Sequence, residues 1–224
     1  MLSPVGPALG EAFPGFGTDG IRGRAGTALT PALCLQVGYW VGRILEAEGP
    51  VLIGMDSRSS GSMVSAALTA GLTAAGRDVW PLGLCPTPAV PLLIRELGAA
   101  GGLMVSASHN PPADNGIKVF GANGAKLSAE RQGRVEAGLR GELLIDGASA
   151  QAFGSARPSS DLLAGYRSAL LGSVGVRRLD GVPVVLDLCW GSATACGAEA
   201  FQALGADLTV LHGEPDGTRI NVAC

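Results

Sequence analysis

The residues with the most chemical potential lie in one stretch, Ser106 to Phe120, which reads SASHNPPADNGIKVF. It begins where the apolar run GGLMV, Gly101 to Val105, ends. A short apolar run of this kind predicts a buried strand, and open α/β sheets bind ligands just beyond the carboxyl ends of their strands. The position of the stretch therefore predicts a functional site.

Four side chains in this stretch suit the handling of phosphate. Ser108 offers a hydroxyl nucleophile, with His109 beside it. Asn110 and free backbone N–H groups can bond phosphate oxygens, and Lys118 brings a compact cation. Phosphoryl transfer asks a protein chiefly for alignment and for neutralisation of charge. The stretch supplies parts of both.

The proline pair Pro111-Pro112 stiffens this loop, because proline fixes φ and biases the residue before it away from helix. We therefore expect Ser108 to lie on an extended, exposed turn. Ser106 is expected to contribute a loop-forming hydroxyl. His212 lies outside any motif and is expected to be a packing or surface residue.

A second polar cluster, FGTDGIRG, spans Phe16 to Gly23 and carries Asp19 and Arg22. Glycines on both sides of Arg22 let the backbone approach an anion closely, while the guanidinium can fork onto phosphate oxygens. Asp56 and Arg58 follow another apolar run and are interpreted as scaffold. They are expected to form a local ion pair rather than to act in catalysis.

The thirteen residues SASHNPPADNGIK resemble the phosphoserine loop of the α-D-phosphohexomutase superfamily. Their Asp-Asn-Gly-Ile-Lys ending is most similar to the bacterial phosphoglucosamine mutase branch. In this family the segment corresponding to FGTDGIRG lies against the phosphoserine loop. The resemblance covers nearly all of residues 13 to 224 and implies that Ser108 is the phosphorylated residue.

The resemblance implies an isomerase that interconverts glucosamine 6-phosphate and glucosamine 1-phosphate through a 1,6-bisphosphate, feeding UDP-N-acetylglucosamine and cell-wall synthesis. Phospho-Ser108 would donate a phosphoryl group and take one back. Arg22, Asn110 and Lys118 would hold that group, with Lys118 also a proton shuttle. His109 would either hydrogen-bond the group or shape the loop.

The resemblance also implies cofactors. One Mg²⁺ would bind through the phosphate of Ser108 and through aspartates of a domain outside these residues, and glucosamine 1,6-bisphosphate would be the activator. The last residues, GEPDGTRINVAC, resemble a second-domain segment. The family carries two further domains with the metal loop, the sugar-recognition loop and the distal phosphate site. We therefore expect a truncated piece that is inactive alone.

Three other interpretations of the loop exist. A phosphomannomutase or phosphoglucomutase would share this loop, because sugar choice is made elsewhere in the family. A non-catalytic phosphate-binding fragment would also fit, since two family domains are missing. A serine hydrolase built on Ser108 and His109 is disfavoured, because adjacent residues of an extended segment point to opposite sides and no Gly-x-Ser-x-Gly elbow occurs.

Composition argues against other classes of partner. The net charge is −3 and no aromatic-interleaved basic stripe occurs, so nucleic acid is not expected. No uncharged apolar run reaches the roughly 18 residues of a spanning helix, so a membrane is not expected. Five separated cysteines fit reduced thiols in the cytoplasm. The expected partner is a small phosphosugar, and the oligomeric state stays open.

Apolar runs alternating with helical periodicity predict an α/β fold with a mixed sheet, and the resemblance implies tandem three-layer α/β domains with mixed sheets, the second truncated. The strand over Gly116 to Gly121 should run antiparallel to its predecessor, because about eight connecting residues cannot hold a crossover helix. Further elements are expected as helices over 30–48, 62–75, 88–97, 128–140 and 161–171, and as strands over 51–56, 78–82, 101–105 and 183–187.

An internal repeat supports the tandem arrangement. The segments Asp56–Gly76 and Asp187–Gly205 each follow an apolar strand. Each segment begins with aspartate and small residues, continues as a helix and ends in glycine. The repeat predicts two similar α/β domains in tandem, a first over residues 1–155, which carries the phosphoserine loop, and a second over residues 156–224, which the resemblance implies is incomplete. The boundary is expected in the Gly/Ser/Ala-rich stretch 141–160.

Overall fold

The computed structural model describes residues 5–10, 13–143 and 153–223. Its main sheet has six strands in the order β1-β2-β6-β5-β3-β4. The pairs β3–β4 and β3–β5 are parallel, whereas β5–β6, β2–β6 and β1–β2 are antiparallel. The antiparallel return of β6 is thus confirmed. The strands are β1 (Phe16–Gly17), β2 (Gly20–Arg24), β3 (Val51–Met55), β4 (Val79–Leu84), β5 (Gly101–Val105) and β6 (Asp114–Gly121).

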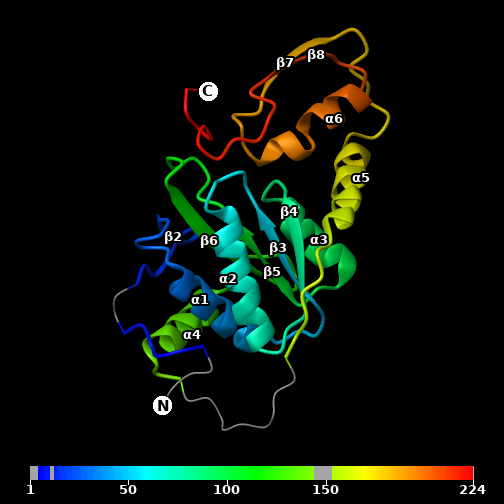
Figure 1. Cartoon of the computed structure of the whole chain (residues 1–224). Coiled ribbons are helices and arrows are strands. Elements are labelled where there is room, and N and C mark those ends of the chain that lie inside the picture. Colours follow the sequence, from blue (N-terminus) through cyan, green and yellow to red (C-terminus); the bar gives the residue numbers. More distant parts are fainter. Residues whose placement is uncertain (1–4, 11–12, 144–152, 224) are drawn as a thin grey trace.

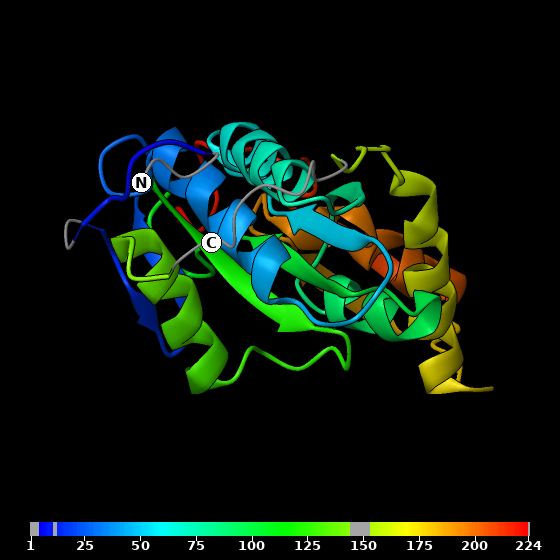
Figure 2. The ribbon, with the colours of Figure 1, turned by 90° about the horizontal axis from the view of Figure 1, so that it is seen from below.

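Helices cover both faces of this sheet, giving three layers (Figures 1 and 2). Side chains alternate along each strand. Ile53 and Leu103 therefore join the core beneath α1, α2 and α4, whereas Leu52 and Met104 join the core beneath α3. The predicted mixed α/β class is confirmed for this unit. The helices are α1 (Pro31–Ile44), α2 (Gly61–Ala74), α3 (Ala89–Leu97) and α4 (Ala129–Arg140).

Helix α1 begins as predicted but ends four residues before the expected Glu48. Thr30 caps its start, accepting a hydrogen bond from the backbone N of Leu33 at 3.2 Å. At the other end the guanidinium of Arg77 donates to the backbone oxygens of Gly42 (2.9 Å), Leu45 and Ala47 (2.8 Å). The free carbonyls of the last turn are thus satisfied by a side chain from beyond α2, a partner that local sequence does not reveal.

The second unit repeats the strand, helix, strand order of β3, α2 and β4. Its two strands pair in parallel, and α5 contacts both α3 and α6 (Figure 1). Its described sheet is parallel only, so the mixed arrangement is that of the first unit. The elements are α5 (Leu163–Val174), preceded by a 3₁₀ turn (Ser160–Leu162), then β7 (Pro183–Asp187), a 3₁₀ turn (Ser192–Ala195), α6 (Gly197–Ala203) and β8 (Asp207–Leu211).

The predicted domain boundary falls partly outside the described residues, which omit 144–152. The described part, 153–159, runs beside β4. The backbone N of Val79 donates to Ser155 O at 2.8 Å, and Arg157 N donates back to Val79 O at 2.9 Å. The connection thus adds to the edge of the first sheet. The division at residue 155 stays a prediction.

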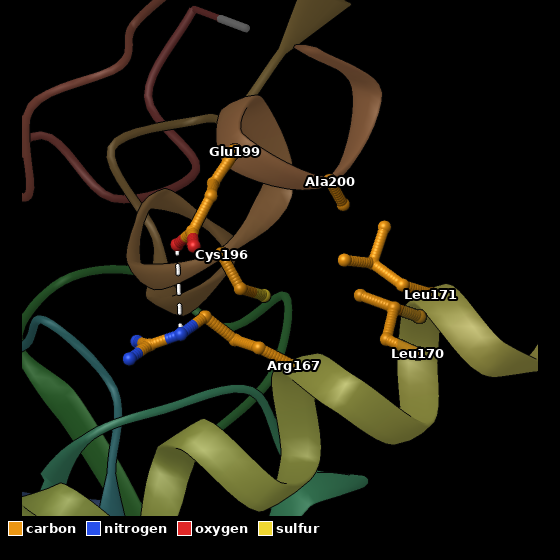
Figure 3. A pocket seen from close by; sticks show the side chains of 6 residues that line it. All are labelled: Arg167, Leu170, Leu171, Cys196, Glu199 and Ala200. Atoms are coloured by element: carbon orange, nitrogen blue, oxygen red, sulfur yellow. Dashed lines mark ion pairs between the residues drawn. The ribbon is translucent and has the colours of Figure 1, made fainter. Parts of the chain in front are cut away.

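A pocket separates α5 from α6 in the second unit (Figure 3). Arg167 and Glu199 face each other across it, with Arg167 Nε 3.5 Å from Glu199 Oε2, and Cys196 lies beside them. The remaining lining is aliphatic. None of the predicted site residues lines this pocket, which marks the packing of the second unit rather than its chemistry.

Candidate active site

Ser108 lies exposed on a tight turn just past β5. Asn110 N donates to Ala107 O at 3.1 Å and closes the turn, while Ser108 N donates to Ser106 Oγ at 3.0 Å. Ser106 therefore has the loop-forming role predicted for it. The prediction of an extended Ser108 is wrong, because its φ is +56°. Ser108 is the first central residue of the four-residue turn from Ala107 to Asn110 and adopts the left-handed region there, and the prolines do not prevent this because they constrain only Asn110 and later residues.

The left-handed conformation of Ser108 costs about 1 kcal/mol for a residue with a Cβ, so its neighbours must hold it. The left-handed conformation also removes one argument against a serine hydrolase. That argument placed Ser108 and His109 on an extended segment with their side chains on opposite sides, and Ser108 is not extended. The missing nucleophile elbow is the remaining argument against a hydrolase. His109 is exposed on the same turn.

A buried arginine braces the turn from within. Arg58 Nη2 donates to the backbone oxygens of Ser108 (2.9 Å) and Asn110 (2.8 Å), and its Nη1 donates to those of Pro111 (2.5 Å) and Asp114 (2.9 Å). Four carbonyls from one loop therefore converge on one guanidinium. A planar guanidinium with five N–H donors suits this role, whereas the ammonium of lysine has three.

The predicted ion pair between Asp56 and Arg58 is present and buried. Arg58 Nε lies 3.1 Å from Asp56 Oδ2, and the two side chains are 0% and 3% exposed. Asp56 thereby aims the guanidinium at the loop of Ser108 and balances its charge. Sequence reasoning identified the pair but missed what the arginine holds, because the four carbonyls lie 50 to 56 residues away in the sequence.

Arg22 approaches the turn from the neighbouring strand. In the pairing of β2 with β6, Arg22 lies opposite Gly116, whose backbone oxygen accepts from Ser106 N at 2.9 Å. The Nη1 of Arg22 lies 3.4 Å from Asn110 Oδ1. Its Nε is buried and has no hydrogen-bond partner within the described part of the chain. Arg22 thus contacts Asn110, which follows Ser108 by two residues in the sequence, and keeps one N–H donor unused.

Asp19 gathers the cations around this site. Its carboxylate lies 2.5 Å from Arg22 Nη2, 3.0 Å from Lys118 Nζ and 2.6 Å from Lys126 Nζ. Both lysines of the sequence are therefore in the cluster. Three cations share one carboxylate, which leaves an excess of positive charge suited to an anion.

The lysines also set the protonation of Asp19. Hydrogen bonds from Lys126 and Lys118 hold the pKa of the Asp19 carboxyl well below its ordinary value, against a smaller opposing effect of burial. Asp19 therefore stays ionised throughout the physiological range. Sequence reasoning assigned no role to Asp19 or Lys126, since their meeting depends on the register of the β1–β2 hairpin against β6.

The amides near Ser108 are already engaged. Asn110 Nδ2 donates to Asp114 Oδ2 at 3.0 Å, so binding phosphate through this side chain would require it to turn. Asn115, buried and not singled out by the sequence, donates from Nδ2 to Ser60 Oγ at 2.8 Å and accepts from Gly116 N at 2.8 Å. Asn115 therefore ties the start of β6 to the loop that carries Arg58.

Neither a metal cluster nor a membrane segment occurs in the described ranges. No three His, Cys, Asp or Glu side chains among residues 5–10, 13–143 and 153–223 are placed to hold a metal ion. No helix among those residues combines the length and apolar character needed to cross a bilayer.

His212, expected to be a packing or surface residue, stacks on Trp190 with ring centroids 3.7 Å apart.

The three-layer unit and its braced serine turn define the first α/β/α domain of a phosphohexomutase. Residues 14–144 match the family described as phosphoglucomutase/phosphomannomutase, alpha/beta/alpha domain I. The match covers more than half of the chain, so the chain belongs to this family.

Relatives and solved structures agree with this assignment. The chain is 80% identical over 222 residues to the phosphoglucosamine mutase of Synechococcus sp. (strain CC9605), covering 99% of this chain and 48% of that protein. It is 72% identical over 225 residues to the phosphoglucosamine mutase of Prochlorococcus marinus (strain MIT 9303), covering 100% and 48%. The chain thus spans about half the length of these curated relatives.

Among solved structures, a phosphoglucomutase/phosphomannomutase family protein from Burkholderia thailandensis superposes with a TM-score of 0.77 at 25% identity. That superposition covers 97% of this chain and 46% of the other. A phosphoglucomutase from Paramecium, 17% identical, shares the fold with a TM-score of 0.68 over 94% and 45% of the two chains. The second unit is included in both superpositions.

Proposed function

We propose that the protein carrying this chain is a phosphoglucosamine mutase of the cytoplasm and that Ser108 is its phosphoryl carrier. The observation that carries the proposal is the setting of Ser108, an exposed hydroxyl on a braced left-handed turn. Arg22 contacts Asn110 on the same turn through Nη1, and Lys118 shares the Asp19 carboxylate with Arg22. These groups suit a dianionic phosphoryl group bound to that hydroxyl.

The reaction proceeds in two transfers. The 1-hydroxyl of glucosamine 6-phosphate gives up its proton and attacks the phosphorus on Ser108, the bond from phosphorus to Ser108 Oγ breaks, and Oγ takes up a proton. Ser108 Oγ then gives up its proton and attacks the 6-phosphorus of the bisphosphate, the bond from that phosphorus to the sugar O6 breaks, and O6 takes up a proton, which leaves glucosamine 1-phosphate and phospho-Ser108. Arg22 would neutralise the charge of the transferred group, and Lys118 would bind it and move the proton. His109 and Asn110 would contact the group from the turn itself.

The described residues fit Mg²⁺ only in part. Phospho-Ser108 would supply one phosphate oxygen, and among the described residues no three His, Cys, Asp or Glu side chains are grouped so as to hold the ion. When bound, the ion would neutralise the charge of the transferred group. Glucosamine 1,6-bisphosphate would act as activator by phosphorylating Ser108.

Activity of the full-length protein tests the proposal. We expect conversion of glucosamine 6-phosphate and loss of both the activity and the covalent phosphate in Ser108→Ala. Losing one preorganised donor costs a factor of roughly 100 or more, so Arg22→Ala and Lys118→Ala should slow turnover to that extent. Rates within a few-fold of the wild type would reject these roles.

The rival substrates are glucose and mannose phosphates. The phosphoglucosamine mutases at 72% to 80% identity favour the aminosugar. Comparing kcat/KM on glucosamine, glucose and mannose 6-phosphates decides between them. A higher kcat/KM on mannose or glucose 6-phosphate would replace the proposed substrate but leave the role of Ser108 intact. Binding of sugar phosphates without any transfer would instead indicate a phosphate-binding module.

A further inference from the structure

The second α/β unit reaches the turn that carries Ser108. Asn221 Nδ2 donates to the backbone oxygen of Ser108 at 2.7 Å and, more weakly, to that of Asn110 at 3.4 Å. Figure 1 shows this C-terminal segment folded back over the connection between β5 and β6. Asn221 has a φ of +61°, a left-handed conformation that asparagine adopts more readily than most residues. An exposed side chain of one unit thus contacts the candidate nucleophile's backbone in the other.

Arg58 and Asn221 share the same carbonyls. The oxygen of Ser108 accepts from Arg58 Nη2 at 2.9 Å as well as from Asn221. A carbonyl oxygen has two lone pairs, so both are used. The two donors together fix the peptide plane that follows Ser108, one from its own unit and one from the next.

The segment that presents Asn221 is itself anchored. The backbone N of Asp216 donates to Trp190 O at 3.1 Å, and that oxygen also accepts from Ser57 Oγ at 2.6 Å. Ile220 N donates to Asp216 O at 3.0 Å, and Ile220 is only 4% exposed. Asn221 is therefore delivered by a turn attached to the loop next to Arg58.

Gly217 shows how closely the two units approach each other. A Cβ at this position would lie 2.3 Å from Ser59 N and 2.4 Å from Ser57 O. These neighbours are backbone atoms and cannot move aside as a flexible side chain can. A side chain at residue 217 would therefore push the second unit away from the loop of Arg58.

We propose that Asn221 is a positioning residue for phosphoryl transfer, by which the second unit holds the peptide plane of Ser108 in register with the phosphate-binding cations. The proposal rests on the proposed function of Ser108. It makes the attachment of the second unit part of the active site, although no side chain of that unit would touch the phosphoryl group in this role.

Steady-state kinetics of the full-length protein give the first test. Asn221→Ala should lower kcat about tenfold with KM within twofold, because one hydrogen bond to the turn is lost and substrate contacts are kept. The isosteric Asn221→Asp should be slower still, since it sets a carboxylate against two carbonyl oxygens. Asn123→Ala is the matched control, because Asn123 accepts from Ala125 N in a local turn away from Ser108, and it should retain wild-type kinetics.

Hydrogen exchange of residues 106–117 in the 224-residue chain gives a test independent of activity. Asn221→Ala and Gly217→Ala should each speed exchange of this loop at least threefold and leave exchange of α1 unchanged. Loop exchange and kcat both within twofold of the wild type in Asn221→Ala would overturn the proposal, as would Asn221→Asp matching the wild type. A wild-type protein without mutase activity would reject the proposed function, and loop exchange would still decide the role of Asn221.

Discussion

Replacing Arg58 with methionine should be among the most damaging single changes in this chain. The Arg58 side chain is fully buried and makes five hydrogen bonds, one to Asp56 and four to loop carbonyls. The variant leaves the Asp56 carboxylate buried without its cation, which costs about 3–5 kcal/mol. At about 2–4 °C per kcal/mol for a chain of this size, the thermal midpoint should fall by roughly 6 to 20 °C.

Urea unfolding followed by circular dichroism measures this loss, and a double variant tests its cause. Asp56→Asn with Arg58→Met removes the unpaired charge, so it should be more stable than Arg58→Met alone. Arg178→Met is the control, because Arg178 pairs with Asp180 in solvent with its side chain 56% exposed, and it should cost less than about 0.5 kcal/mol. A loss below about 1 kcal/mol in Arg58→Met, or a double variant no more stable than the single one, would refute the reasoning.

Two further predictions concern protonation. Asp19→Asn should lower the free energy of unfolding by about 1 kcal/mol at pH 7, a value that allows for screening by solvent. Because the pKa of Asp19 is lowered in the folded chain, its contribution is complete above the unfolded value of about 4 and fades below it. The difference in free energy of unfolding between wild type and variant, measured in urea, should therefore be smaller at pH 3 than at pH 7. An equal difference at the two pH values would contradict the ion cluster. Burial raises the pKa of the Cys34 and Cys85 thiols to about 12, so at pH 8 Ellman's reagent should modify them only after unfolding, and after the half-buried Cys189. Fast labelling of Cys34 or Cys85 in the native chain would contradict the packed core.

The first unit follows closely from its sequence. Apolar runs predict β3 and β5, and the cap Thr30 with its following proline predicts the start of α1. The length of the connection predicts the direction of β6, because geometry leaves a short link no other choice. What local sequence could not give is the early end of α1, since Arg77 reaches its carbonyls from beyond α2.

The site was only partly visible in the sequence. The dense polar stretch around Ser108 and the glycine-flanked Arg22 were recognisable by residue type, and the structure places them on adjoining elements. The left-handed φ of Ser108, the convergence of Lys126 on Asp19 and the loop carbonyls around the buried guanidinium depend on strand register and on contacts between distant loops. Such contacts have no local signature.

Mapping covalent phosphate tests the central claim most directly. The full-length protein, stripped of phosphate by a phosphatase, is incubated with glucosamine 1,6-bisphosphate, digested and analysed by tandem mass spectrometry. We predict a single phosphate, on Ser108; if that phosphate is radiolabelled, adding unlabelled glucosamine 6-phosphate should move the label into the sugar phosphates while Ser108 is rephosphorylated from them. Phosphate on another residue, or an active mutase with Ser108 unmodified at every stage of turnover, would contradict the account.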